Sequence, residues 1–147
     1  MKLIQIMNNI DELIQQEIKS GNKFKLETYR AIKAEFLKAK TEKNAKELDE
    51  VRKLQILQKM IKQREDSANQ YIKANRLDLA ADEKAEIAII AEFLPEEVTK
   101  EEIEAAIVNC NIEKTKSNMG SIIKVIKSQL PLADGKLVAE TVKKYLI

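Results

Sequence analysis

The sequence contains no histidine, no tryptophan and a single cysteine, Cys110. Histidine is the commonest general base at neutral pH and a frequent metal ligand, so its absence excludes Ser-His-Asp and Cys-His catalytic groups and Cys/His zinc sites. One cysteine cannot form a disulfide within the chain. Carboxylate chemistry stays open because 24 Asp and Glu residues are present. We expect no metal site and no cofactor.

Long apolar runs are also missing. The first residues reach Asp11 and Glu12 before any signal-like apolar segment develops. No segment approaches the roughly 20 apolar residues that a membrane-spanning helix needs, and the short run at 87–94 is better explained as the core side of one helix. These features predict a cytoplasmic protein with no membrane partner.

Glycine and proline are scarce, with three and two residues respectively, and their positions outline the predicted helices. Before Pro95, apolar residues three and four apart predict an all-α fold, because no stretch alternates with period two. Gly21 is expected to end the first helix, Asp49 to cap the third, and Asp78 to cap the fourth, which would bury Ala81, Ala85, Ala88, Ile89 and Phe93. The first helix is predicted at about 2–20, and the second follows Gly21 and ends at about residue 41. The third is predicted from Asp49 to about residue 73, and the fourth from Asp78 to residue 94.

Three shorter helices are expected after Pro95. Thr99 begins a capping-box pattern, Met119 and Gly120 lie in the first turns of the next helix, and Pro131 ends that helix. Glycine inside a helix is unfavourable by up to about 1 kcal/mol, so Gly120 indicates close helix packing or backbone access to a partner. The sequence thus predicts two domains, a four-helix domain at 1–94 and a compact three-helix domain at 95–147.

The stretch LPLADGKLV at 130–138 has the Asp-Gly-Lys core of a possible phosphate-binding loop. A P-loop, however, needs two glycines flanking four residues, followed by Lys and Ser or Thr after a strand. We interpret this stretch as a helix boundary, in which Asp134 caps the last helix and Gly135 and Lys136 lie in its first turn. Asp134 would also oppose an anion at that helix end.

The net charge of +2 hides blocks of opposite sign along the chain. Residues 23–40 hold six basic and two acidic residues, and residues 52–76 hold seven basic and two acidic residues. Residues 78–97 reverse the balance, with seven acidic residues and one lysine. Such blocks are typical of solvated helix sides, and basic ones can also bind phosphates. The candidate phosphate contacts are Arg30, Lys33, Lys59, Lys62, Arg64, Lys73 and Arg76.

Five segments in order resemble the YqeY family: YRAIKAEFLKAK (29–40), KQREDSANQYIKANRLDLAADEKAEIAII (62–90), EFLPEEVTKEEIE (92–104), NMGSIIKVIK (118–127) and ADGKLVAETVKK (133–144). That family is similar to the C-terminal tail of the B subunit of tRNA-dependent amidotransferases, which convert Glu-tRNA(Gln) or Asp-tRNA(Asn) to the amidated form. The resemblance implies a four-helix domain followed by a three-helix domain, and it makes Met119, Gly120, Asp134, Gly135 and Lys136 a motif of structural or contact residues.

The resemblance also raises the expectation of RNA binding, because the tail contacts the tRNA body while other domains of the amidotransferase perform the chemistry. We therefore expect a non-catalytic protein that binds tRNA or another structured RNA, with no DNA partner. One alternative is an adaptor that docks on an amidotransferase or a synthetase. A second alternative is carbon–nitrogen ligase activity with glutamine as the amido donor, which the resemblance to the family implies. Against catalysis by this chain alone, Cys110 lies at an apolar helix position without a histidine, so we interpret it as a buried structural thiol.

Overall fold

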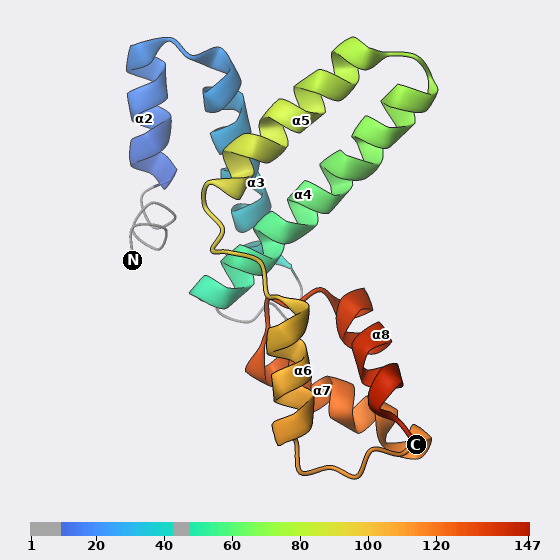
Figure 1. Cartoon of the computed structure of the whole chain (residues 1–147). Coiled ribbons are helices and arrows are strands. Elements are labelled where there is room, and N and C mark those ends of the chain that lie inside the picture. Colours follow the sequence, from blue (N-terminus) through green and yellow to red (C-terminus); the bar gives the residue numbers. More distant parts are fainter. Residues whose placement is uncertain (1–9, 43–47) are drawn as a thin grey trace. The chain divides into compact units, whose positions relative to one another are not determined.

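The computed structural model describes residues 10–42 and 48–147, which form helices and no strand (Figure 1). The prediction of an all-α fold is confirmed for these residues. The first expected helix, at about 2–20, lies partly outside them. The described helices are α2 (Ile10–Ser20), α3 (Lys23–Thr41), α4 (Glu50–Lys73), α5 (Leu77–Ala91), α6 (Lys100–Asn109), the 3₁₀ helix η1 (Lys116–Asn118), α7 (Met119–Gln129) and α8 (Gly135–Tyr145).

The chain divides into two compact units, Met1–Pro95 and Glu96–Ile147. Helices α2 to α5 belong to the first unit, and α6, η1, α7 and α8 to the second. Each unit has its own cluster of buried apolar side chains. The sequence-based division into a four-helix domain at 1–94 and a three-helix domain at 95–147 stays a prediction.

Three helix starts have the caps that the sequence predicts. The side chains of Asp49, Thr99 and Asp134 each accept a hydrogen bond from the backbone N–H three residues later, at 2.8, 3.2 and 3.0 Å respectively. Each bond satisfies an N–H group that has no partner within its helix, and such a cap contributes about 1 kcal/mol to stability. Pro131 follows α7 as expected, since that helix ends at Gln129.

The turn between α2 and α3 is also the predicted one. Gly21 has a φ of 77°, a conformation that glycine adopts without steric cost, and its N–H donates to the Glu17 carbonyl at 3.0 Å. Asn22 then caps α3 by accepting a hydrogen bond from the Lys25 N–H at 3.1 Å. This turn joins α2 and α3 into a helical hairpin.

The predicted start of α5 is wrong by two residues, because Asp78 was expected at the N-cap position. The helix begins at Leu77 with Arg76 at the N-cap position, and Asp78 lies inside the first turn. The Asp78 carboxylate binds the Arg76 side chain. The start is early because α4 ends at Lys73 and the turn closes within three residues.

The predicted buried side of α5 is partly wrong. Ile89 and Phe93 are buried as expected, but Ala81, Ala85 and Ala88 are exposed. The apolar contacts come from Ala80 and Ile90, and the half-buried Glu83, Glu86 and Ile87 also lie on the inner side. Alanine buries too little area to orient a helix, and the glutamates on the inner side obscure the apolar pattern.

The core of the first unit lies where α3 and the α4–α5 hairpin meet. Leu57 and Ile90 are fully buried there, and Phe36 packs in the same cluster. The rings of Tyr29 and Phe93 form an edge-to-face pair with centroids 5.8 Å apart, a geometry that aromatic rings prefer. The pair ties α3 to the segment that follows α5.

Burial raises the pKa of the Tyr29 hydroxyl above its ordinary value, and Glu92 and Glu17 add to the effect. Because the folded state holds this proton more tightly, the unfolded chain releases it first, near its ordinary pKa of 10.0. We expect the melting temperature to fall as the pH rises above about 10, and to fall less in Tyr29→Phe. Thermal melts at pH 8 and 10.5 measure this. An equal fall in both proteins would contradict it.

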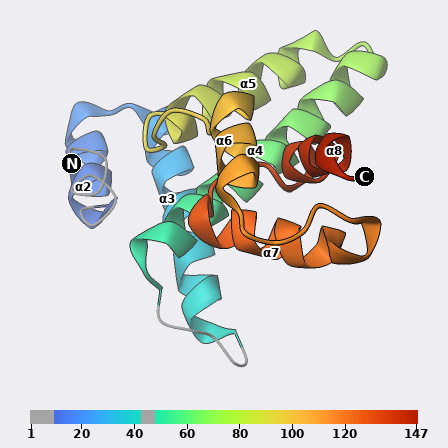
Figure 2. The same cartoon turned by 60° about the horizontal axis from the view of Figure 1, so that its bottom comes forward.

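The second unit contains α6, α7 and α8 (Figure 2). These helices pack around a cluster of fully buried side chains. Its members are Ile103, Ile107, Ile122, Ile126, Val138 and Val142. Two lysines fix the loops: Lys114 Nζ donates to the carbonyls of Cys110 and Ile112 at 2.5 and 2.8 Å, and Lys127 Nζ donates to the Ala133 carbonyl at 2.7 Å. These bonds satisfy carbonyls at or beyond helix ends that would otherwise need water.

Candidate nucleic-acid interface

Three of the predicted phosphate contacts lie on one side of α4. Lys59, Lys62 and Lys73 are all exposed, and their intervals of three and eleven residues are close to one and three helical turns. The fourteen residues from Lys59 to Lys73 correspond to about 21 Å along the helix axis. We call these three lysines the basic side of α4. The residues between them are mostly polar, and Asp66 is an acidic member of the same stretch.

Arg64 lies on the other side of α4, against α5. Its Nε donates to Glu86 Oε2 at 3.0 Å and its Nη1 donates to the Met60 carbonyl at 3.3 Å. The Arg64 and Glu86 side chains are 18% and 28% exposed, so water screens this ion pair only partly. The structure thus places Arg64 in the contact between the two helices, away from the basic side of α4.

The two candidates on α3, Arg30 and Lys33, differ in their contacts. Arg30 is exposed, whereas Lys33 Nζ lies 2.5 Å from Asp11 Oδ1 and so links α3 to α2. The sequence places both residues on one predicted side of the helix because they are three apart. Their positions agree with that spacing, but the ion pair to α2 gives Lys33 a role inside the unit.

Arg76 lies in the turn between α4 and α5, beside Lys73. Its Nε and Nη2 donate to the two carboxylate oxygens of Asp78 at 3.3 and 3.2 Å. These hydrogen bonds raise the pKa of the Arg76 guanidinium and lower the pKa of the Asp78 carboxyl. Both side chains remain more than half exposed. The two parallel hydrogen bonds between the Arg76 guanidinium and the Asp78 carboxylate orient the plane of the guanidinium, which stays exposed to solvent.

A cleft of about 220 Å³ lies between α3 and α4, next to the basic side of α4. Its lining includes Lys59 and Arg52, together with the acidic Glu35 and Glu42 and apolar groups such as Met60. Arg52 forms an ion pair with Glu42 at 3.6 Å. Sequence reasoning did not find this cleft, because the packing of two helices creates it and no local motif marks it.

The C-terminal motif lies in the second unit. Met119 is half-buried against the core of that unit, Asp134 caps α8, and Lys136 is exposed. A Cβ atom added to Gly120 or Gly135 would meet no atom within 4 Å among the described residues. Close helix packing therefore does not explain Gly120, and that expectation is wrong. Access of a partner to the Gly120 backbone stays a prediction.

The interpretation of Cys110 as a buried thiol is confirmed, since only 8% of the residue is exposed at the end of α6. Within 10–42 and 48–147, no three Cys, Asp or Glu side chains are grouped so that they could hold a metal ion. The helices of the same ranges include none that is both long and apolar enough to span a bilayer.

A comparison with family models gives one finding that covers both units. The model described as Yqey-like protein matches residues 7–146. The match therefore includes the basic side of α4, the α4–α5 turn and the C-terminal motif. A search of the curated proteins gave no match.

Proposed function

Because the chain belongs to the YqeY family, we propose that it is a non-catalytic cytoplasmic protein of translation that binds structured RNA, with tRNA as the expected class. The basic side of α4 carries this proposal. Lys59, Lys62 and Lys73 project from one side of a single helix over about 21 Å. The similarity of the family to the amidotransferase tail, which contacts a tRNA body, supports the choice of ligand.

The physical basis is the release of counterions from RNA phosphates. Lysines in a row along a rigid helix neutralise several phosphates of one backbone, and this attraction depends on shape rather than on base sequence. Arg30 on α3 and Arg76 in the α4–α5 turn are exposed and would extend the contact within the same unit. Arg64 and Lys33 would contribute indirectly, by holding α4 to α5 and α3 to α2.

We also propose that the two units are separate domains. The first would contain four helices and carry the RNA contact. The second, with about fifty residues and its own core, would be a compact three-helix domain that presents Gly120 and Lys136 to a partner.

The basic side of α4 is tested by a variant with three substitutions, Lys59→Ala/Lys62→Ala/Lys73→Ala. At 200 mM salt we expect it to bind tRNA roughly tenfold more weakly than the original chain, and at 50 mM salt the difference should be larger, because three phosphate contacts are lost. The slope of log K against log salt should become shallower by about 2 to 3, since each contact contributes about 0.7 to 0.9. Fluorescence anisotropy with labelled tRNA at 50 and 200 mM salt measures both quantities.

The matched control is Lys19→Ala/Lys84→Ala/Lys124→Ala, which removes the same charge from exposed positions on α2, α5 and α7. The proposal requires this variant to bind nearly as the original chain does. Equal weakening by both triple substitutions would show that net charge alone matters and would reject the basic side of α4 as the interface. An original chain that binds no tRNA at 50 mM salt would reject RNA binding and favour an adaptor, whose apolar docking contact would depend little on salt.

A further inference from the structure

The turn between α4 and α5 is tightly ordered by backbone hydrogen bonds. The Arg76 N–H donates to the Tyr71 carbonyl at 2.8 Å and the Asn75 N–H donates to the Ile72 carbonyl at 3.0 Å. Asn75 has a φ of 58°, in the left-handed region that asparagine tolerates. This is a Schellman motif, which normally brings an apolar residue at the position of Arg76 near the residue at the position of Tyr71. Here an arginine occupies the place of that apolar residue.

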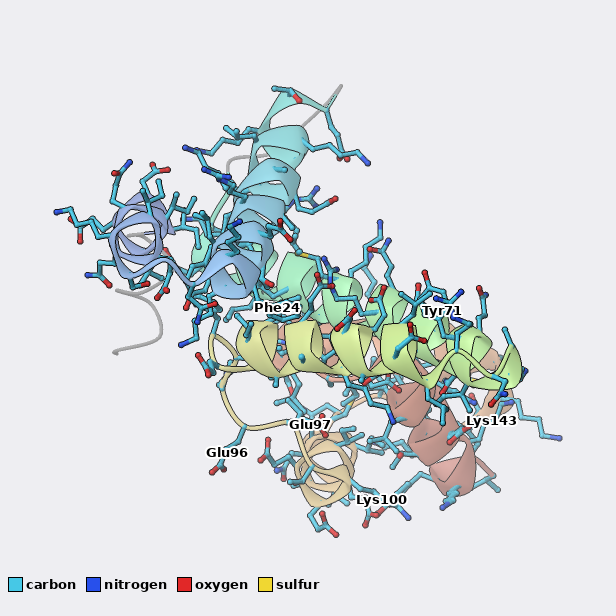
Figure 3. All side chains as sticks on the ribbon, turned by 90° about the horizontal axis from the view of Figure 1, so that it is seen from above. Phe24, Tyr71, Glu96, Glu97, Lys100 and Lys143 are labelled. Carbon is cyan, nitrogen blue, oxygen red and sulfur yellow. The ribbon has the colours of Figure 1, made fainter. Side chains whose placement is uncertain are left out.

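The turn presents flat and apolar groups to solvent. Asp78 holds the Arg76 guanidinium in a fixed plane through two hydrogen bonds. Leu77 is 61% exposed and Ile72 is 42% exposed, although both are large apolar residues. Tyr71 is half-buried near the same turn (Figure 3). Within its unit, this end of the hairpin is distant from α2 in both views of the ribbon (Figures 1 and 2).

The turn is continuous with the basic side of α4. Lys73, the last residue of that side, is also the last residue of the helix, and Arg76 follows three residues later. An RNA backbone that follows the lysines along α4 would therefore bring its next nucleotides to Leu77 and the Arg76 plane. The faces of paired bases are covered by their neighbours in a duplex, whereas unpaired bases stack on aromatic rings and on arginine planes.

We propose that the α4–α5 turn binds unpaired nucleobases, so that the RNA recognised by this protein combines a stem along α4 with a loop or single-stranded end at the turn. This inference rests on the proposed function and specifies the RNA feature that it needs. Arg76 and Tyr71 supply the flat surfaces, and Leu77 and Ile72 supply apolar contact to the bases. Lys73 contacts the phosphate between the stem and the unpaired nucleotides.

The experiment compares two RNAs with the full-length chain. One is a hairpin with a loop of unpaired nucleotides, and the other is a blunt duplex with the same stem. Fluorescence anisotropy at 100 mM salt should give roughly tenfold tighter binding of the hairpin, because one stacked base changes affinity by about five- to a hundredfold. Arg76→Lys keeps the charge and removes the plane, and Leu77→Ala removes the apolar contact. Both variants should lose most of the preference for the hairpin. Leu77→Ala removes no phosphate contact, so it should also keep its affinity for the duplex.

The matched control for Leu77→Ala is Leu37→Ala, which shortens a leucine that is 50% exposed on α3; it should keep the full preference. Equal binding of hairpin and duplex by the original chain would overturn the inference and leave the proposed function intact. An unchanged preference in both turn variants would also overturn it. Failure to bind either RNA would overturn both proposals. If Leu77→Ala weakens binding to a purified amidotransferase but not to RNA, the turn is a protein-docking surface and the inference is wrong.

Discussion

Ile126→Ala is expected to unfold residues 96–147 at 25 °C and to leave the helices of the first unit folded. Ile126 is fully buried in the core of the second unit. Truncating a buried isoleucine to alanine costs about 2 to 5 kcal/mol, and a core of about fifty residues supplies only about 3 to 5 kcal/mol. Far-UV circular dichroism should show loss of part of the helix signal, and methyl NMR should show that only one set of core resonances collapses.

The control for this result is Val108→Ala in the same unit. Val108 is 66% exposed on α6, so its truncation should change the unfolding free energy by less than about 0.5 kcal/mol. Simultaneous loss of both sets of core resonances in Ile126→Ala would contradict the proposal that the units are separate domains. If only the resonances of the second unit collapse, Ile126→Ala provides a full chain in which the second unit is unfolded. RNA binding by α4 could then be measured in that variant.

Arg64→Leu is expected to destabilise the first unit by about 2 to 3 kcal/mol at pH 7. The substitution leaves Glu86 partly buried without its cation, and an uncompensated charge of this kind is more costly than the ion pair was stabilising. Burial and the neighbouring Glu86 already raise the pKa of Glu83, while Arg64 opposes the rise. Urea titrations monitored by circular dichroism give the free energy of unfolding of each variant.

The pH dependence and a second substitution distinguish this explanation from simple loss of packing. The pKa of Glu83 is raised in the folded state, and loss of Arg64 removes the charge that opposes this rise. The folded variant therefore binds the Glu83 proton more tightly than the unfolded chain does, so the deficit of Arg64→Leu should shrink as the pH falls towards the ordinary glutamate pKa of 4.5. The double variant Arg64→Leu/Glu86→Leu should recover most of the lost stability at pH 7. Removing the exposed Arg76, whose partner is also exposed, should have a much smaller effect. A pH-independent deficit, or a double variant worse than the single one, would contradict the ion-pair explanation.

The helix boundaries were predictable because their signals are local. Asp49, Thr99 and Asp134 each bind a backbone N–H three residues away, so the residue type and its position before an apolar pattern are enough to locate the cap. Gly21 is local in the same sense, since its φ of 77° depends on one residue. The start of α5 was harder because Arg76 occupies a cap position that arginine rarely fills.

The candidate site was only partly predictable because its geometry depends on distant partners. The three-residue spacing predicts that Lys59 and Lys62 share one side of α4, and the observed extent of the helix places Lys73 on that side as well. It did not show that Arg64 turns inward to a glutamate twenty-two residues later, or that Lys33 pairs with Asp11 on another helix. Those contacts depend on how helices pack, and the sequence pattern of one helix contains no information about the partner that it will meet.

The two lysines that fix the loops of the second unit change how the charge of this chain should be counted. The ammonium groups of Lys114 and Lys127 donate hydrogen bonds to main-chain oxygens at 2.5 to 2.8 Å. These two lysines therefore stabilise loops of their own unit and are less accessible to a ligand than the exposed lysines. A binding isotherm interpreted through the formal charge of +2 would treat them as equal to the exposed lysines of α4. Among the described residues, the cations that a polyanion meets are therefore the exposed lysines and arginines, and Lys114 and Lys127 should be left out of that count.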